Sequence, residues 1–154
     1  MAQDASPAAP ATGVAVDPYR SFNFKLEIKG LVEGHFTECS GLGIRVHPIR
    51  YREGGVGQIV RVIPGAVEYA ELVLRYGLTS SRDLWDWFMK SVSGQVERRN
   101  VSVIMLAANN ADEALRWNLV NAWPSEWRGA TLDALGREAA IEELKLAYDS
   151  LDRA

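Results

Sequence analysis

Residues 80–94 have the sequence SSRDLWDWFMKSVSG, the clearest helical pattern in the chain. Ser80 and Asp83 predict its start, because a serine oxygen and a first-turn carboxylate can accept from the free backbone N–H groups there. Gly94 predicts its end. Apolar residues at steps of three and four share one face, namely Leu84, Trp85, Phe88 and Val92. A helix this short is marginal alone in water, so we expect this face to lie on a sheet.

The segments before and after this helix alternate between apolar and polar residues, which is the period of a half-buried strand. The alternation is clearest from Phe22 to Ile28. We predict further strands at 34–40, 44–53, 58–63, 66–77, 101–106 and 115–122. The spacing of apolar residues in 138–151 fits both a helix and a strand, and composition alone favours a helix.

Prolines mark the irregular points of these strands. Pro48 lacks the N–H donor of a strand ladder, so we expect a bulge or an edge position there. Pro64 with Gly65 predicts a turn, and Trp123 with Pro124 predicts the end of the strand before it.

Length and composition predict one globular domain. The chain has 154 residues, of which 47% are hydrophobic and 24% charged, which is ordinary for a folded domain of this size. Residues 1–16 are rich in Ala and Pro without periodicity, so we predict a flexible arm followed by one domain, 17–154. The net charge of −3 disfavours a stand-alone nucleic-acid binder. We find no membrane-spanning run and no signal peptide pattern, and therefore expect folding in the cytoplasm without membrane insertion.

No residue pattern predicts a catalytic centre, a metal site or a cofactor site. His35 and His47 are too few for most zinc sites and have no paired helical spacing. Cys39 is the single cysteine, and we expect it to be a small buried apolar residue. A nucleophile and base pair of Cys39 with a histidine lacks an orienting third residue, so we predict that the chain is not an enzyme.

Two features predict binding surfaces instead. Trp87 lies off the apolar stripe of its helix, so we predict that it anchors a contact between subunits. A row of basic residues fits an anionic partner, a solvent-exposed strand face or an oligomer interface, namely Arg45, His47, Arg50 and Arg52. The residues alone therefore indicate a β-rich binding or structural domain with one helix.

Specific strings extend this reading to a family. They are FNFKLEIKG from Phe22, FTECSGLGIRV from Phe36, IRYREGG from Ile49, VRVIPG from Val60, SSRDLWDWF from Ser80, ERRNVSV from Glu97, RWNLVNAWPSEW from Arg116 and EAAIEELKLAYDSL from Glu138. In this order and spacing, the chain from Asp17 to Leu151 resembles the short, single-domain tail tube proteins of contractile phage tails and of phage-tail-like contractile injection systems.

The resemblance implies a mainly β (α+β) fold, in which two packed antiparallel sheets form a β-barrel-like domain with one outer helix. This shape is shared with the haemolysin-coregulated proteins of type VI secretion, and it implies that 138–148 is a strand. Six copies are implied to form a ring, and rings to stack head-to-tail into a hollow tube that carries DNA or protein cargo inside a sheath. Ring closure removes unpaired strand edges, and a stacking contact that does not close on itself gives an open helix.

The resemblance also implies roles for individual residues. The loop that contacts the next ring is implied to contain Arg52, Glu53, Gly54, Gly55, Gly57 and Gln58. The helix side that faces the sheath is implied to contain Arg82, Asp86, Trp87 and Lys90. Candidates for the lumen wall are Lys25, Glu27, Lys29, Arg45 and His47. Assembly is expected in the bacterial cytoplasm, with a virion tail or an extracellular particle as the final location, and Gly55→Trp is expected to block stacking without unfolding the domain.

Three alternatives remain open at this stage. The first is a tube-initiator subunit of the baseplate, which would stop at a single ring. The second is a monomeric β-barrel that binds a small ligand in its interior, although no convergent polar set marks a pocket. The third is an enzyme that uses Cys39 and a histidine.

Overall fold

The computed structural model describes residues 23–31, 36–52, 54–55, 59–78 and 80–154. Their elements are, in chain order, β1 (Phe24–Ile28), β2 (Phe36–Ser40), β3 (Ile44–Arg52), β4 (Val60–Tyr69), β5 (Leu72–Gly77), α1 (Asp83–Val92), β6 (Arg99–Leu106), β7 (Glu113–Arg128), β8 (Ile141–Ala147) and β9 (Ser150–Arg153). The predicted arm, 1–16, and the predicted domain boundary at Asp17 lie outside the described residues.

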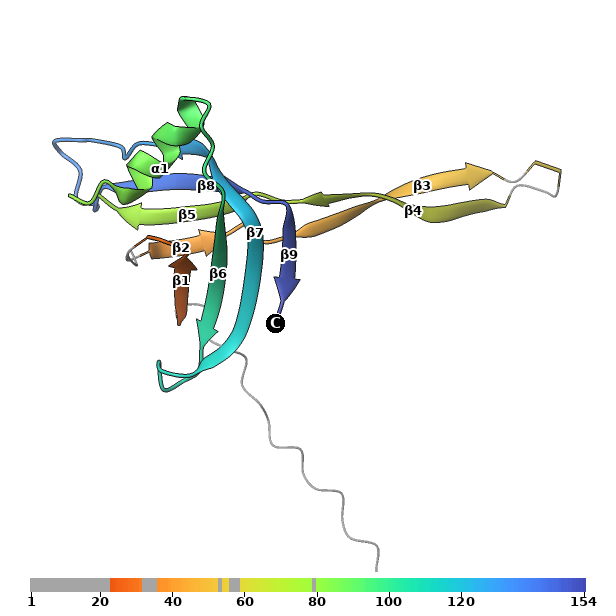
Figure 1. Cartoon of the computed structure of the whole chain (residues 1–154), viewed down its shortest axis with the longest axis horizontal. Coiled ribbons are helices and arrows are strands. Elements are labelled where there is room, and N and C mark those ends of the chain that lie inside the picture. The colour runs from red at the N-terminus through yellow and green to blue at the C-terminus, as the bar shows by residue number, and fades with distance from the viewer. Residues whose placement is uncertain (1–22, 32–35, 53, 56–58, 79) are drawn as a thin grey trace, which may run out of the picture.

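One long strand, β7, joins two halves of a seven-stranded antiparallel sheet. The first part of β7 pairs with β6 and β9, and its second part pairs with β8. The first half ends at β1 and the second half continues through β5 to β2. The two halves run crosswise to each other (Figure 1). The two halves act as two antiparallel sheets packed on each other, which confirms the prediction of a mainly β fold of this kind. In the described residues they do not close into a barrel.

The change of direction in β7 occurs at a bulge. Between the pairs Arg99 with Ala122 and Val101 with Leu119, β7 contains one residue more than β6. One residue of this bulge, Asn121, has a left-handed backbone with φ 54°. Extra residues bend and twist a strand, which lets one strand serve two sheets.

The predicted strand end at Trp123 and Pro124 is therefore wrong, because β7 continues to Arg128. Pro124 stands opposite Leu146 of β8, and the register shifts again between Pro124 and Glu126. A second bulge thus accommodates the residue that cannot donate to the ladder.

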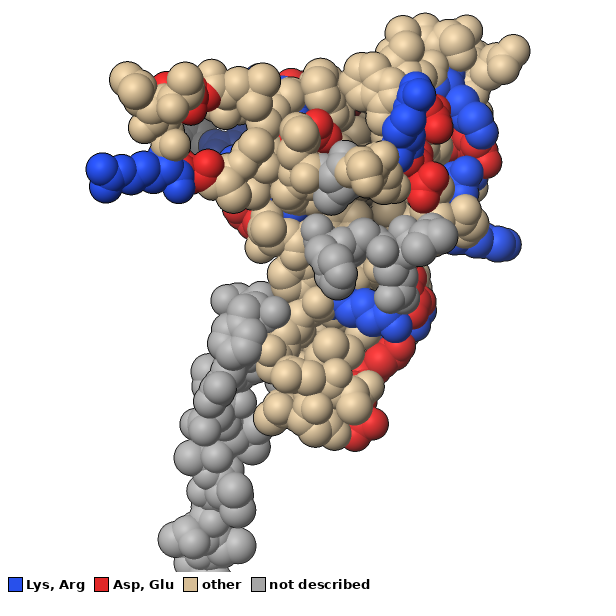
Figure 2. Space-filling view, turned by 90° about the vertical axis from the view of Figure 1, so that its left-hand side faces the viewer, with Lys and Arg blue, Asp and Glu red and all other residues tan. Residues whose placement is uncertain are grey.

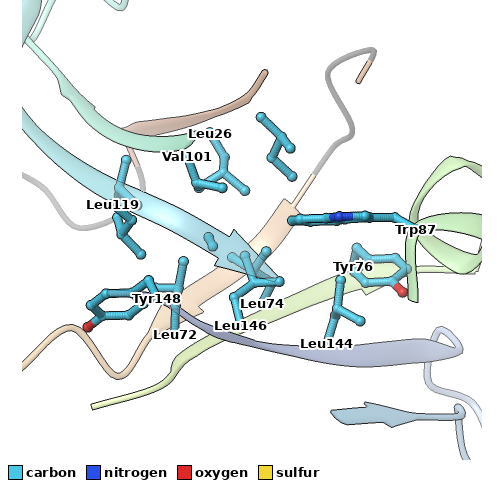
Figure 3. Packing of buried hydrophobic residues seen from close by; sticks show 13 residues of the cluster. Leu26, Leu72, Leu74, Tyr76, Trp87, Val101, Leu119, Leu144, Leu146 and Tyr148 are labelled. Atoms are coloured by element: carbon cyan, nitrogen blue, oxygen red, sulfur yellow. The ribbon is translucent and has the colours of Figure 1, made fainter. Parts of the chain in front are cut away.

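The core lies between the two halves of the sheet (Figure 3). Leucine and valine side chains with at most 5% exposure meet there from both halves: Leu26, Val101, Val103 and Leu119 from the first, and Leu72, Leu74, Leu144 and Leu146 from the second. Each fully buried side chain of this kind contributes about 1.5–3 kcal/mol relative to exposure. Leu144 and Leu146 also explain why 138–151 does not form a helix. β8 pairs with strands on both sides and buries every second residue, and this tertiary pairing outweighs the local preference.

Helix α1 begins later than predicted and turns a different face to the core. Its N-cap is Arg82, which makes no side-chain capping bond, so Ser80 does not start the helix. Its end matches the prediction, because Gly94 has φ 81° and donates its N–H to the Ser91 carbonyl, and Gln95 donates to Lys90. These two bonds form a Schellman motif.

Trp87 is 1% exposed and belongs to the core cluster, whereas Val92 is 62% exposed. Leu84, Trp87 and Phe88 follow the i, i+3, i+4 spacing of one helical face, so the buried stripe is rotated from the predicted one. The predictions that Trp87 faces outward and anchors an intersubunit contact are wrong, because this large indole fills the space between the helix and the sheet.

Candidate assembly surface

Strands β3 and β4 form a separate two-stranded ribbon that extends away from the rest of the domain (Figure 1). Their antiparallel register runs from Ile44 opposite Tyr69 to Arg52 opposite Val60. Among the described residues, no third strand pairs with either of them. An isolated two-stranded hairpin is marginally stable in water, so this ribbon is a segment that needs further contacts.

Two prolines and a glycine shape the middle of the ribbon. Pro48 stands opposite Pro64, and the register shifts between Val46 and Pro48, which confirms the irregularity predicted at Pro48. A Cβ on Gly65 would meet the His47 carbonyl oxygen at 2.7 Å, so a side chain does not fit there. The turn predicted at Pro64 and Gly65 is wrong. Strand β4 continues through both residues. Pro48 and Pro64 are tolerated opposite each other because they lie next to a bulge in a two-stranded ladder, where their missing N–H donors are not needed.

Large apolar side chains of the ribbon are exposed to solvent by 41–62%. In β3 they are Ile44, Val46, Ile49 and Tyr51, and in β4 they are Val60, Val62, Ile63 and Val67. Because side chains alternate along a strand, these residues lie on both faces of the ribbon, and exposed apolar surface of this extent is typical of a protein interaction site. The amino-acid pattern did not predict these as contact residues, because valine and isoleucine alternate in the same way in a buried strand.

The ribbon is also basic. Its two strands contain Arg45, Arg50, Arg52 and Arg61 against one acidic residue, Glu68. Side chains alternate across a strand, so Arg45 and His47 lie on one face of β3, and Arg50 and Arg52 lie on the other. The predicted single basic row is therefore divided between two faces. His47 is 2.7 Å from the Glu68 carboxylate across the ribbon.

The predicted contact loop lies at the far end of this ribbon. Arg52, Gly54 and Gly55 are exposed there, and Gly55 has φ 103°. Three other residues of the predicted loop lie outside the described residues, namely Glu53, Gly57 and Gln58.

A second polar surface covers the outer face of the first half of the sheet. Arg116 of β7 contacts Glu27 of β1 at 3.4 Å, Glu113 at 2.8 Å and the Ser102 hydroxyl of β6 at 3.2 Å. The hydrogen bond from Arg116 lowers the pKa of the Glu113 carboxyl, and Glu113 raises the pKa of Arg116. Lys25 pairs with Glu27 at 3.0 Å. Positive and negative charges are therefore matched between β1 and β7, with the Ser102 hydroxyl of β6 between them.

The predicted lumen residues fall into two groups. Lys25 and Glu27 belong to this polar surface, and Lys29 follows directly at the end of β1. Arg45 and His47 lie on the ribbon instead. The structure does not bring the two groups together.

Polar residues of α1 form a third surface. Arg82 and Asp86 are 3.8 Å apart one helical turn from each other, and Lys90 pairs with Glu97 beyond the helix. On the adjoining side, the rings of Trp85 and Trp127 make an edge-to-face contact at 4.9 Å. The three predicted polar residues of the helix are thus exposed, while Trp87 is not.

Among the described residues, those with possible catalytic chemistry are not assembled into a site. Burial raises the pKa of the Cys39 thiol to about 11, so this cysteine is not a thiolate at neutral pH. His35 lies outside the described residues, and His47 is held by Glu68. Within the described ranges, no group of three or more His, Cys, Asp or Glu side chains is arranged to hold a metal ion. The same ranges contain no helix with the length and hydropathy needed to cross a membrane.

A family model described as T4-like virus tail tube protein gp19 matches residues 20–152 of this chain. No curated protein sequence matches it significantly. Several solved structures have a similar fold. A chain of the sheath/tube terminator of PVC, an extracellular contractile injection system in the extended state, is 24% identical with a TM-score of 0.84, and the match covers 92% of this chain and 99% of that one.

Two further structures agree on this fold. A chain of the anti-feeding prophage tube-terminating cap is 23% identical with a TM-score of 0.81, over 96% of this chain and 98% of that chain. Hcp1 from Flavobacterium johnsoniae is 12% identical with a TM-score of 0.57, over 84% of this chain and 93% of that chain.

Proposed function

The chain belongs to the T4-like virus tail tube protein gp19 family, and we propose that six copies of it close into a ring. Rings stack into the hollow inner tube of a contractile phage tail or a phage-tail-like injection system. The tube carries protein or DNA cargo, is surrounded by a sheath and starts on a baseplate. Family and fold are those of structural tube proteins, and a role as the main tube subunit is favoured over an initiator or a ligand-binding barrel.

The observation that carries this proposal is the exposed apolar ribbon of β3 and β4. None of the buried core residues that the structure describes belongs to this ribbon. A ribbon that is marginally stable without further contacts is explained by insertion between neighbouring copies. Arg52, Gly54 and Gly55 then lie at the point that reaches furthest into the next ring.

The other two surfaces receive roles by the same reasoning. The charge-matched surface with Lys25, Glu27 and Arg116 is assigned to the lumen wall, since paired charges present a polar surface with little net attraction for a passing cargo. Arg45 and His47 are assigned to contacts between copies, because they lie on the ribbon. The exposed side of α1, with Arg82, Asp86 and Lys90, is assigned to the sheath.

Assembly takes place in the bacterial cytoplasm under this proposal, and the finished tube is part of a virion tail or of an extracellular particle. Negative-stain microscopy of the purified full-length chain tests the proposal directly. Hollow rods or hexagonal rings are the expected result, and material that stays monomeric at high concentration, even with its sheath and baseplate, overturns it.

The contact role of the ribbon is tested by a matched pair of variants. Val62 in the ribbon and Val92 on α1 are both 62% exposed, so an aspartate at either position leaves the core intact. Val62→Asp places a charge in the proposed contact and is expected to abolish rods, whereas Val92→Asp is expected to preserve them. Equal assembly of both variants contradicts the assignment.

The loop at the end of the ribbon is tested at Gly54. Because Gly55 has φ 103°, Gly55→Trp strains the backbone as well as adding bulk. A Cβ on Gly54 meets nothing within 4 Å, so Gly54→Trp adds bulk alone, with Gly54→Ala as its control. Gly54→Trp is expected to block stacking, and rods of normal length from this variant contradict the loop assignment.

A further inference from the structure

A second exposed apolar element lies at the end of the molecule opposite the ribbon (Figure 1). It is the connection between β7 and β8, residues 129–140, which we call the end loop. Its Leu132 and Leu135 are 82% and 91% exposed. Leu78, 57% exposed, lies at the base of this loop, because its N–H donates to the Ala140 carbonyl at 3.0 Å.

The tip of the end loop has a defined turn. The Asp133 side chain accepts the N–H of Leu135 at 3.0 Å, and its carbonyl accepts the N–H of Gly136 at 3.0 Å. These bonds hold the backbone around Leu135, and Leu132 directly precedes this turn. A leucine on an ordered turn docks at a lower entropic cost than one on a free chain.

The charges of the two ends are complementary. The ribbon strands contain four arginines against Glu68, whereas the end loop and the first residues of β8 contain Arg137 against Asp133, Glu138 and Glu142. Glu143, the next residue of β8, is already paired with Arg75 of β5 at 3.5 Å. Figure 2 views the molecule from the end-loop side and shows wide uncharged areas beside clusters of acidic and basic side chains. An apolar surface with acidic neighbours thus lies at one end, and an apolar surface with basic neighbours at the other.

We propose that the end loop of one copy is the docking site for the β3–β4 ribbon of a copy in the adjacent ring. Two different surfaces at opposite ends of one chain cannot satisfy each other within it. Between copies they form a head-to-tail contact that repeats without closing, which is the geometry of a growing tube. Opposite charges around the apolar contact fix its orientation and exclude like ends. This inference rests on the proposed tube assembly and names the surface that receives the ribbon.

The contact is tested by disulfide formation between two differently marked chains, both in a Cys39→Ser background. One chain is tagged and contains Val62→Cys in the ribbon, and the other is untagged and contains Leu135→Cys in the end loop. Mild oxidation of co-assembled rods is expected to give a tagged–untagged dimer. The control pair combines Val62→Cys with Val92→Cys, which has the same exposure as Val62 but lies on α1, and is expected to give none.

A second variant measures the contribution of the leucines. In Leu132→Ser with Leu135→Ser, the equilibrium for adding a ring is expected to fall by about tenfold or more, because apolar burial is lost at both positions. Both side chains are exposed in the single copy, so its unfolding temperature should not change. Sedimentation of polymer against protein concentration measures this loss.

The outcomes separate this inference from the proposed function. If the unchanged chain forms no rings or rods, the proposed function fails. If rods form but the ribbon and end-loop cysteines do not join, or the control pair joins equally well, the docking site is wrong while the tube assignment stands. Rods from the double serine variant that form normally but no longer bind sheath also overturn the inference, by making the sheath the occupant of the end loop.

Discussion

The indole Nε1 of Trp87 donates a hydrogen bond of 2.8 Å to the backbone carbonyl of Glu97. The guanidinium of Arg99 lies over the same ring, 5.8 Å from its centroid, and donates to the Lys29 carbonyl at 2.9 Å. Arg99 also pairs with the Glu97 carboxylate at 2.9 Å. One buried ring therefore fixes the helix, the segment that follows it and the end of β1 relative to one another.

Replacing Trp87 separates its hydrogen bond from its volume. Trp87→Phe retains an aromatic ring but leaves the Glu97 carbonyl without its donor, which is expected to lower the free energy of unfolding by about 1–3 kcal/mol. Trp87→Ala also opens a cavity and is expected to cost about 3–5 kcal/mol. Urea unfolding at one fixed protein concentration measures both values.

The matched control is Trp85→Phe on the same helix, at a position that is 37% exposed. It removes an indole from the surface and is expected to change the free energy of unfolding less than Trp87→Phe does. Equal losses at the two positions show that the hydrogen bond to Glu97 does not contribute.

The carboxylate of Glu97 makes the stability of this junction dependent on pH. Its hydrogen bond from Lys90, with the positive charge of Arg99 nearby, lowers the pKa of the Glu97 carboxyl in the folded state. A lowered folded-state pKa gives stability that is present above the unfolded value, roughly 4.3, and is lost as pH falls through the folded value. Glu97→Gln is therefore expected to lower the unfolding temperature at pH 7, with a difference that shrinks as the pH falls below 4.

Thermal unfolding of Glu97→Gln and the unchanged chain at a series of pH values measures this difference. Glu138→Gln, in the exposed end loop, is the control for loss of one negative charge. An unfolding temperature difference that stays constant from neutral to acidic pH contradicts the role assigned to the Glu97 carboxylate.

The helix shows what periodicity could predict and what it could not. Its existence and its end at Gly94 followed from spacing and a glycine with positive φ. Its buried face did not, because Trp85 and Trp87 are both aromatic and spacing does not distinguish which one meets the sheet. The hydrogen bond from Trp87 to Glu97 decides between them, and that bond depends on the path of the chain after the helix.

The strands show a corresponding limit. Alternation located most of them, but the prediction treated Pro64 and Pro124 as ends although both lie inside strands. A proline is compatible with a strand where a bulge removes the need for its donor, and a bulge is defined by the partner strand rather than by local sequence. Prediction of the candidate assembly surface from the sequence was limited for the same reason. The exposure of Val62 and Ile63 depends on the absence of a covering strand in the described structure, which no local pattern encodes.

Gly65 allows the ribbon to pass its central bulge. A Cβ there would lie 2.7 Å from the His47 carbonyl oxygen and 2.8 Å from the Ile49 side chain. Gly65→Val is therefore expected to distort the pairing of β3 with β4 at this bulge only and abolish rods, while the far-UV spectrum and the core remain close to those of the unchanged chain. Microscopy and circular dichroism of the same sample measure the two effects.

Gly77 provides the matched control for this substitution, because a Cβ there meets nothing within 4 Å. Gly77→Val adds the same side chain to β5 of the main sheet and is expected to preserve rods. Loss of rods in both variants shows that the ribbon bulge is not the sensitive point.

The bend of β7 depends on the left-handed backbone of Asn121, at φ 54°. Its side-chain amide donates to the Asp149 carboxylate at 2.9 Å, and its N–H donates to the Asn100 side chain at 3.2 Å. Asn121→Gly can still adopt positive φ but loses the exposed side-chain hydrogen bond to Asp149, so we expect the free energy of unfolding to fall by about 1 kcal/mol. Asn121→Val adds about 1–3 kcal/mol of backbone strain, because a β-branched residue is disfavoured at positive φ. Urea unfolding should therefore rank the unchanged chain above Asn121→Gly and Asn121→Val last. Equal stability of the two variants shows that the bend of β7 does not require a left-handed residue.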